Sequence, residues 1–262
     1  MAAAVRQPSL CLPHGGGPCF FMDDPSGVWS GMRAFLEGVP AGLPEPPRAI
    51  LVISGHWETQ GFRLTGAAQP DLVYDYFNFP PYTYALRYDV PGDPARAAGL
   101  LTAAGLQAGV DPVRGLDHGV FIPLKVALPD AAIPVVERSL DHGLDPALHL
   151  ASGEALAPLR DEGVLVLATG MSFHNMRGCG DPRFTAPSQA FDGWLTGVLE
   201  AAGPERAAQL ALWAQAPDAR ACHPREEHLL PAMVAAGAAS GAGRRIYSEL
   251  VLRTALPGYR FD

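Results

Sequence analysis

Short apolar segments that end at glycine, serine or histidine set the strongest limit on how this chain can fold. Four such segments are predicted to be buried strands: Ser9–Leu12, Ala49–Ser54, Ile133–Arg138 and Val164–Thr169. Segments with alanine, leucine and arginine at helical spacing lie between and after them: Pro94–Leu106, Pro146–Arg160, Ser188–Ala202 and Glu226–Ala236. Strands that alternate with helices predict an α/β fold with a mostly parallel central sheet and helices on both faces.

Composition narrows the classes of protein further. The chain has 262 residues, 48% of them hydrophobic, which favours one globular domain over residues 1–262. Its formal net charge is -8, and its 19 basic residues are scattered, which argues against a nucleic-acid partner. No apolar run approaches the ~20 residues that cross a bilayer, and no secretory signal is readable. We therefore expect a cytoplasmic protein without membrane association.

The cysteines predict neither disulfides nor a thiolate zinc site. Four are present, at Cys11, Cys19, Cys179 and Cys222, and none has the CxxC spacing. We expect buried or incidental thiols.

Three of the eight histidines directly follow predicted strands. His14 stands in Leu-Pro-His-Gly-Gly-Gly, His56 in Ser-Gly-His-Trp-Glu and His174 in Gly-Met-Ser-Phe-His-Asn. Ligands of parallel sheets bind beyond the carboxyl ends of the strands, where these side chains are expected to meet. One histidine after a strand is more often a turn residue, but three together indicate a metal site, because imidazole is a common ligand of zinc and iron.

Two further histidines lie in the segment Cys-His-Pro-Arg-Glu-Glu-His. Pro224 suits the first turn of a helix, which would place His228 about one turn inside it. The five-residue spacing differs from the H-E-x-x-H motif of zinc proteases. His228 is the better ligand candidate, whereas His223 is equally typical of a polar residue near a helix cap.

The tetrapeptide Leu-Asp-His-Gly occurs twice, at 116–119 and 140–143, but the flanking sequences do not repeat. His118 leads into an apolar run that would bury it, and we expect it to be functional. His142 leads into a polar turn, and we expect only a turn residue. His149 lies in a helix rich in alanine and leucine and is predicted to be a surface or packing residue.

Five motifs along the chain together resemble the class III extradiol ring-cleaving dioxygenases, in particular their DOPA 4,5-dioxygenase branch. The motifs occur in the order of that family between positions 14 and 228: His14-Gly15-Gly16-Gly17-Pro18, Ser54-Gly55-His56-Trp57-Glu58, Asp117-His118-Gly119 with Pro123-Leu124, Ser172-Phe173-His174-Asn175, and His223-Pro224 with Glu227-His228. The resemblance implies a single catalytic α/β domain with one mononuclear non-haem metal ion. It also implies opening of a catechol ring beside its two hydroxyls, with insertion of both atoms of dioxygen.

The same resemblance implies roles for individual residues. His14 and His56 are expected metal ligands, and His228 is the expected third ligand; the alternatives at that position are His223, Glu226 and Glu227. Three histidines suit zinc as well as iron, so Fe(II) and Zn(II) both stay open. His174 is the expected base for the catechol protons. His118 is expected to hydrogen-bond the bound oxygen or a substrate hydroxyl and later to act as an acid.

The expected partners are a small aromatic diol and dioxygen. Trp57, beside His56, and His223 are expected at the substrate pocket. The aromatic segment between Tyr74 and Tyr88 is typical of a ring-binding wall, of a subunit interface in a homo-oligomer, or of ordinary loop packing. Three side chains are candidates to meet a substrate carboxylate: Arg87, Arg114 and Arg177.

Two other functions compete with ring opening. A zinc-dependent hydrolase would use the same histidines to activate water, with His174 or Glu227 as its base. A metal-free binding protein on the same scaffold is disfavoured by the retention of all five histidine positions. Consumption of dioxygen distinguishes the dioxygenase from the hydrolase.

Overall fold

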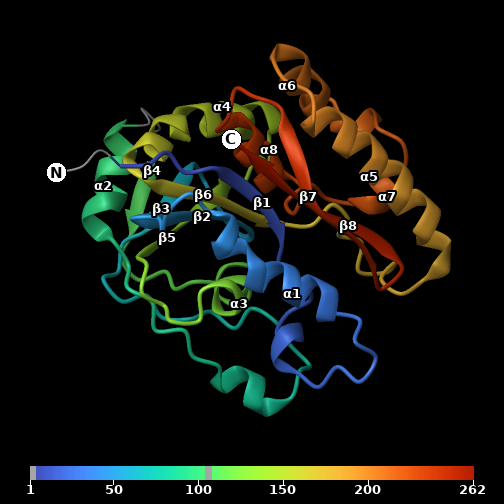
Figure 1. Ribbon diagram of the computed structural model, residues 1–262, viewed down its shortest axis with the longest axis horizontal. Coiled ribbons are helices and arrows are strands. Elements are labelled where there is room, and N and C mark those ends of the chain that lie inside the picture. The colour runs from blue at the N-terminus through green and yellow to red at the C-terminus, as the bar shows by residue number, and fades with distance from the viewer. Residues whose placement is uncertain (1–3, 104–107) are drawn as a thin grey trace.

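The protein is represented by a computed structural model that describes residues 4–103 and 108–262. One eight-stranded sheet forms its centre, with strand order β4-β3-β5-β2-β6-β1-β8-β7 (Figure 1). The strands are β1 (Ser9–Pro13), β2 (Ala49–Thr59), β3 (Phe62–Thr65), β4 (Ala108–Asp111), β5 (Val135–Asp141), β6 (Val164–Gly170), β7 (Gly243–Val251) and β8 (Thr254–Phe261).

Four central strands run parallel and confirm the predicted fold class. β6 pairs in parallel with both β1 and β2, and β2 pairs in parallel with β5. These four strands match the predicted apolar segments, although β5 begins at Val135, two residues after the predicted start at Ile133. Every residue of β6 is buried. The antiparallel pairs lie toward the edges, where β8 joins β1 to β7 and β3 joins β5. The sheet is therefore mostly parallel, as expected.

Helices cover both faces of the sheet. They are α1 (Ser30–Gly38), α2 (Pro94–Ala103), α3 (His118–Ala127), α4 (Pro146–Leu156), α5 (Thr185–Leu199), α6 (Pro204–Ala211), α7 (Ala219–Cys222) and α8 (Leu230–Gly237). Figure 1 shows α1 and α3 on one side of the central strands and α4 and α8 on the other. Short 3-10 segments occur at Cys19–Phe21, Val39–Gly42, Pro81–Ala85, Ala157–Glu162, Pro182–Phe184 and Trp213–Gln215.

Several helix boundaries differ from the prediction. The helix expected from Pro146 ends at Leu156, and a 3-10 segment follows it; the carboxylate of Asp145 accepts a hydrogen bond from the Ala147 N–H at its start. The part of the first expected helix beyond Ala103 lies outside the described residues.

The helix expected over Glu226–Ala236 begins later than predicted. α8 starts at Leu230, because Pro231 rather than Pro224 occupies its first turn. His228 therefore lies in the turn before the helix, and its expected position one turn inside a helix is wrong.

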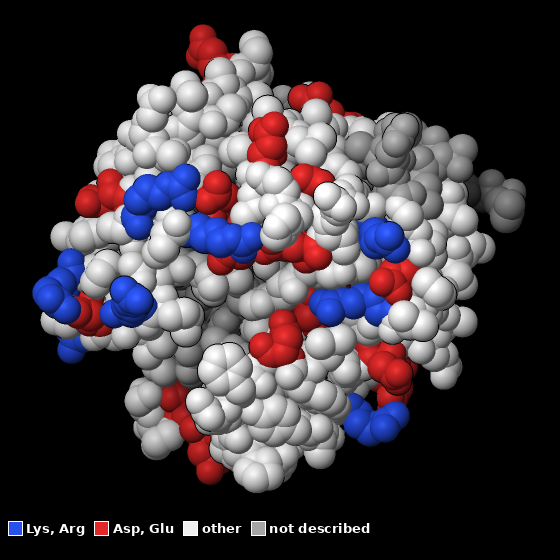
Figure 2. Space-filling view, turned by 180° about the vertical axis from the view of Figure 1, so that it is seen from behind, with Lys and Arg blue, Asp and Glu red and all other residues white. Residues whose placement is uncertain are grey.

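Two surface properties bear on partners. Across the described residues, no helix combines the length and the apolar character needed to span a bilayer. On the face shown in Figure 2, acidic and basic side chains lie interspersed among uncharged ones.

Candidate metal centre and active-site cavity

Five histidines converge at the carboxyl ends of the parallel strands. His14 follows β1, and His174 follows β6 by a few residues. His56 lies within β2, which runs on to Thr59 with irregular pairing after Ile53, so it does not follow the strand as expected. His118 is the first residue of α3, and His228 lies in the turn before α8. Chain segments far apart in sequence thus bring imidazoles to one place.

The rings of three of these histidines form a compact group. The ring centroids of His14 and His56 are 5.0 Å apart, those of His14 and His228 are 5.2 Å apart, and those of His56 and His228 are 4.5 Å apart. The Nε2 atoms of His56 and His228 lie 3.1 Å from each other. The Nε2 atom of His14 is buried and has no hydrogen-bond partner among the described residues.

Backbone and carboxylate oxygens fix the other ring nitrogen of each histidine. His14 Nδ1 donates to the carbonyl oxygen of Gly15 at 2.9 Å. Glu227 Oε1 accepts from His228 Nδ1 at 3.0 Å and from His174 Nδ1 at 2.9 Å. Because carbonyl and carboxylate oxygens only accept, these bonds place the proton on Nδ1 and leave the Nε2 lone pair for a ligand.

Asp75 is a second carboxylate that holds two histidines, as Glu227 does. Its Oδ1 accepts from His118 Nδ1 at 2.7 Å, and its Oδ2 lies 3.4 Å from His56 Nδ1. Asp75 was not among the predicted site residues, because aromatic residues dominate the segment that contains it. Two carboxylates, Asp75 and Glu227, thus orient four imidazoles.

Burial keeps the central histidines neutral. It lowers the pKa of His14 and that of His228 well below the ordinary value, and the neighbouring His56 lowers both further. Burial and then the nearby His118 lower the pKa of His56 to about 4. Neutral imidazoles are the form that binds metal ions.

The carboxylates stay ionised despite their burial. Burial alone would raise the pKa of Asp75, but the hydrogen bonds from His118 and the nearby imidazoles of His118 and His56 hold it below the ordinary value. Burial likewise opposes ionisation of Glu227, and the hydrogen bond from His174 lowers its pKa overall. Each carboxylate can therefore hold its imidazole N–H donors at neutral pH.

Two separate groups of three side chains have the spacing of a metal site. The ligand atoms of His14, His56 and His118 lie within 4.8 Å of one another, and so do those of His174, Glu227 and His228. In the second group the Glu227 carboxylate already accepts two N–H bonds, which makes it an orienting group.

Glu226 and His223, the other candidates for the third metal ligand, have hydrogen-bond or ion-pair partners of their own. Glu226 pairs with Arg220 at 2.8 Å. His223 Nε2 donates to the carbonyl oxygen of Ser172 at 2.9 Å, and its ring is buried between those of Phe191 and Trp213. Burial lowers the His223 pKa to about 3.

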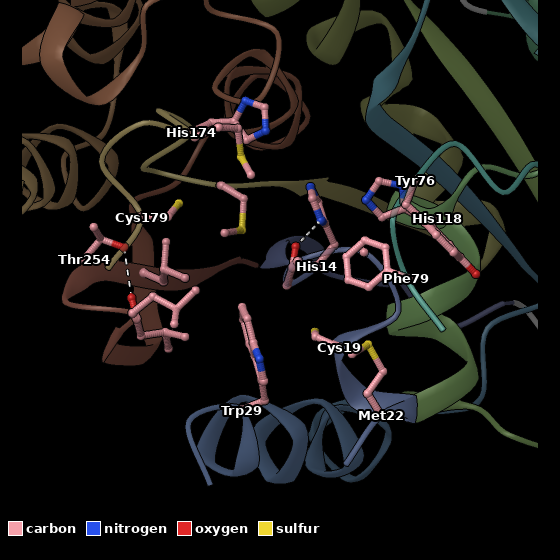
Figure 3. A pocket seen from close by; sticks show the side chains of 18 of the residues that line it. His14, Cys19, Met22, Trp29, Tyr76, Phe79, His118, His174, Cys179 and Thr254 are labelled. Carbon is pink, nitrogen blue, oxygen red and sulfur yellow. Dashed lines mark hydrogen bonds between the residues drawn. The ribbon is translucent and has the colours of Figure 1, made fainter. Parts of the chain in front are cut away.

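A cavity of about 580 Å³ opens beside the histidines. His14, His56, His118 and His174 line it, and His228 lies behind them. Figure 3 shows His14 between His174 on one side and Trp29 on the other, with Phe79 close by. A single ring bound here would contact both imidazoles and apolar side chains.

The two residues expected at the substrate pocket, Trp57 and His223, are not among the described residues that line the cavity. Trp57 follows His56 along β2 and, because successive strand residues point to opposite faces, it lies on the other side of the strand. There the guanidinium of Arg114 covers its ring at 5.2 Å. The aromatic segment does contribute to the wall, through Tyr76, Phe77 and Phe79.

The remaining histidines lie away from the cavity lining. His142 sits in an exposed turn after β5, and its Nδ1 is 3.2 Å from Glu58 Oε2. His149 is buried in α4, where Nδ1 donates to the Asp145 carbonyl at 2.7 Å and Nε2 accepts from the Asp141 N–H at 3.2 Å. His149 is a packing residue.

The chain has relatives in fungi, plants and bacteria. It is 39% identical over 253 residues to a protein of Hapsidospora irregularis named dioxygenase tasH, covering 88% of this chain and 78% of that protein. It is 36% identical over 244 residues to a 4,5-DOPA dioxygenase extradiol of Beta vulgaris, covering 90% and 87%. The crystal structure of an uncharacterized protein of Escherichia coli K12 superposes with a TM-score of 0.77 and 27% identity, covering 98% of this chain and all of that one.

The family comparison agrees with these relatives and with the geometry. The sequence model described as the catalytic LigB subunit of aromatic ring-opening dioxygenase matches residues 9–259. This match confirms the resemblance of the histidine motifs to extradiol ring-cleaving dioxygenases. With five imidazoles gathered at one end of its parallel strands, the chain belongs to the family of catalytic LigB subunits of aromatic ring-opening dioxygenases.

Proposed function

We propose that His14, His56 and His228 bind one iron(II) ion and that this extradiol dioxygenase opens the ring of a catechol bound beside them. One observation carries the ligand assignment: His56 Nε2 and His228 Nε2 face each other at 3.1 Å while the Nδ1 atoms of both rings face carboxylates. Two lone pairs that face each other repel, and a shared cation turns this repulsion into attraction. Bound iron(II) supplies the redox chemistry through which dioxygen reacts with a catechol.

His174 is the proposed base. Glu227 holds its Nδ1 proton, so Nε2 is free to take a proton from a catechol hydroxyl in the cavity. The negative charge of Glu227 then stabilises the imidazolium that forms. His174 also lines the cavity, whereas its stacked neighbour His228 does not.

His118 is the proposed acid and hydrogen-bond donor on the opposite side of the cavity. Its Nδ1 donates to Asp75, and the backbone N–H of the same residue donates to the same oxygen at 3.0 Å. Two bonds to one carboxylate oxygen fix the ring, and the carboxylate stabilises the protonated form that an acid needs.

The alternative function, a zinc-dependent hydrolase, is not favoured. The family and its relatives are dioxygenases, and their match extends over almost the whole described chain. Zinc itself stays the alternative to iron, because three imidazoles suit either ion.

We further infer that residues 1–262 act as one catalytic domain located in the cytoplasm. One sheet contains strands from both ends of the chain, which supports the single domain. All four cysteines are free thiols, as is typical of a reducing compartment.

The test begins with the metal. Protein purified under nitrogen is analysed for metal content, loaded with iron(II), and assayed in an oxygen electrode with a panel of catechols. Oxygen uptake matched to a ring-opened product supports the proposal, and His14→Ala, His56→Ala and His228→Ala should each lose iron. Tight zinc without oxygen uptake after iron loading, or full iron occupancy in all three variants, would contradict it.

A further inference from the structure

The cavity wall beyond the histidines is mostly apolar. Six large side chains form much of it: Trp29, Phe79, Met171, Met176, Leu252 and Leu256. Its volume of about 580 Å³ falls within the range, roughly 300–1,000 Å³, of pockets that hold drug-sized ligands. An unsubstituted catechol is a single ring and would leave much of this apolar surface uncovered.

The rim of the cavity is apolar as well. Phe77, Met176 and Leu252 are 78%, 71% and 37% exposed, and all three line the cavity. They come from three separate segments: the aromatic loop, the loop after β6 and the turn between β7 and β8. Exposed apolar side chains are unremarkable one at a time, but a group around one opening marks a surface that binds an apolar ligand.

The charges at the cavity are unfavourable for a carboxylate. Asp23, Asp24 and Asp75 line it, whereas no lysine or arginine does so among the described residues. Asp24 is already engaged, since its carboxylate accepts from the backbone N–H groups of Val28 and Trp29. An anionic substituent would meet acidic side chains without a cation to neutralise it.

The three arginines expected to meet a substrate carboxylate do not line the cavity. Arg87 pairs with Asp89 at 2.6 Å on the surface. Arg114 pairs with the buried Asp117 at 3.1 Å. Arg177 is exposed on the loop after β6.

We propose that the preferred substrate is a catechol with a large, apolar ring substituent that carries no carboxylate. This inference rests on the proposed function, which places the catechol oxygens at the histidines. The substituent then extends along Trp29 and Met171 toward Met176 and Leu252 at the rim. Burying each added methylene against this wall strengthens binding.

A matched pair of probes tests the charge. 3,4-Dihydroxyphenylpropionate and its methyl ester have the same ring and chain, and only the first carries a carboxylate. With the iron-loaded enzyme, we expect the ester to have a kcat/KM at least tenfold higher. The 4-alkylcatechols from methyl to hexyl test the apolar wall, and kcat/KM should rise about threefold per methylene. Calorimetry on the metal-free protein under nitrogen should give dissociation constants in the same order.

A charge added at the rim provides the reciprocal test. Met176→Arg should lower the ester-to-acid ratio of kcat/KM at least fivefold, because it supplies the missing cation. Leu212→Arg adds the same charge at a position that is 56% exposed and does not line the cavity, and it should leave the ratio unchanged.

The outcomes separate the two proposals. No oxygen uptake with any probe would contradict the proposed function. Ring opening in which the acid matches or exceeds the ester, or in which chain length has no effect, would overturn the substrate class and leave the dioxygenase function intact.

Discussion

The imidazole of His174 lies flat against that of His228, with ring centroids 3.3 Å apart and planes inclined by 16°. Both rings donate to the same oxygen of Glu227. The proposed base is therefore held by the proposed ligand and its carboxylate, although only the base faces the cavity. One carboxylate thus contacts both the proposed metal ligand and the proposed base.

His174→Ala should keep iron and lose turnover. The rings of the proposed ligands His14, His56 and His228 should stay in place, but the proposed base for the catechol proton is gone. We expect kcat to fall by roughly 10²–10⁴, measured by oxygen uptake together with metal analysis. His142→Ala, at an exposed turn, should behave like the wild type. Wild-type turnover in His174→Ala would remove this residue as the base.

Glu227→Gln should weaken iron binding while every proposed ligand remains. The amide lacks the negative charge that holds the Nδ1 protons of His174 and His228. Removing such an orienting group costs about 10–100-fold in metal affinity, measurable by chelator competition. Glu226→Gln is the matched control, because Glu226 pairs with Arg220 on the surface. Equal affinities in both variants would contradict the orienting role.

Gly119→Ala should displace His56. A Cβ atom at this position would lie 2.5 Å from Ser54 Oγ and 2.8 Å from His56 Cδ2, so the imidazole must shift. We expect lower iron occupancy and a loss of about 1–3 kcal/mol in the free energy of unfolding. The same substitution at Gly197 in α5, where no atom lies within 4 Å of the new Cβ, should stabilise by roughly 0.5–1 kcal/mol. Unchanged iron occupancy in Gly119→Ala would show that the His56 position tolerates the contact.

The buried His149 should make stability depend on pH. Burial lowers its pKa to about 4, below the ordinary value of 6.5. Between these values the unfolded chain binds more protons than the folded one. The contribution of His149 to the free energy of unfolding is therefore complete above pH 6.5 and is lost as the pH falls toward 4. Between pH 7.5 and pH 5.0, His149 should lower the free energy of unfolding by about 2 kcal/mol.

Urea unfolding of the metal-free protein at both pH values measures this loss. His149→Gln can replace both hydrogen bonds of the imidazole without titrating, and should reduce the pH dependence by that amount. His142→Gln, at an exposed position, should retain the full pH dependence. Identical pH dependence in His149→Gln and the wild type would contradict the assignment.

The predictable part of the fold was its buried centre. β1, β2, β5 and β6 were recognisable because strands covered on both faces are continuous in apolar residues. β7 was missed because most of its side chains are exposed, and β8 because Pro257 and Gly258 interrupt its pattern. β3 and β4 have four residues each, too few to show a period.

The site was predictable where a histidine follows a strand and unpredictable where a loop supplies the partner. Asp75 reaches His118 across 43 residues of sequence, and no local pattern indicates that contact. Trp57 was misplaced for another reason: β2 runs on to Thr59, beyond the predicted strand end at Ser54. His56 and Trp57 are therefore successive strand residues, whose side chains point to opposite faces.

Because β1 lies inside the sheet, the sheet can be completed only late in the folding of this chain. Ser9 pairs with Val166 of β6 on one side and with Phe261 of β8 on the other. The second pairing joins residues at opposite ends of the described chain, and such non-local contacts form slowly. During synthesis β1 emerges long before β8, and until β8 is made one edge of β1 stays unpaired, which is a state prone to aggregation. Because His14 directly follows β1, we expect the proposed metal centre to form only once both edges of β1 are paired.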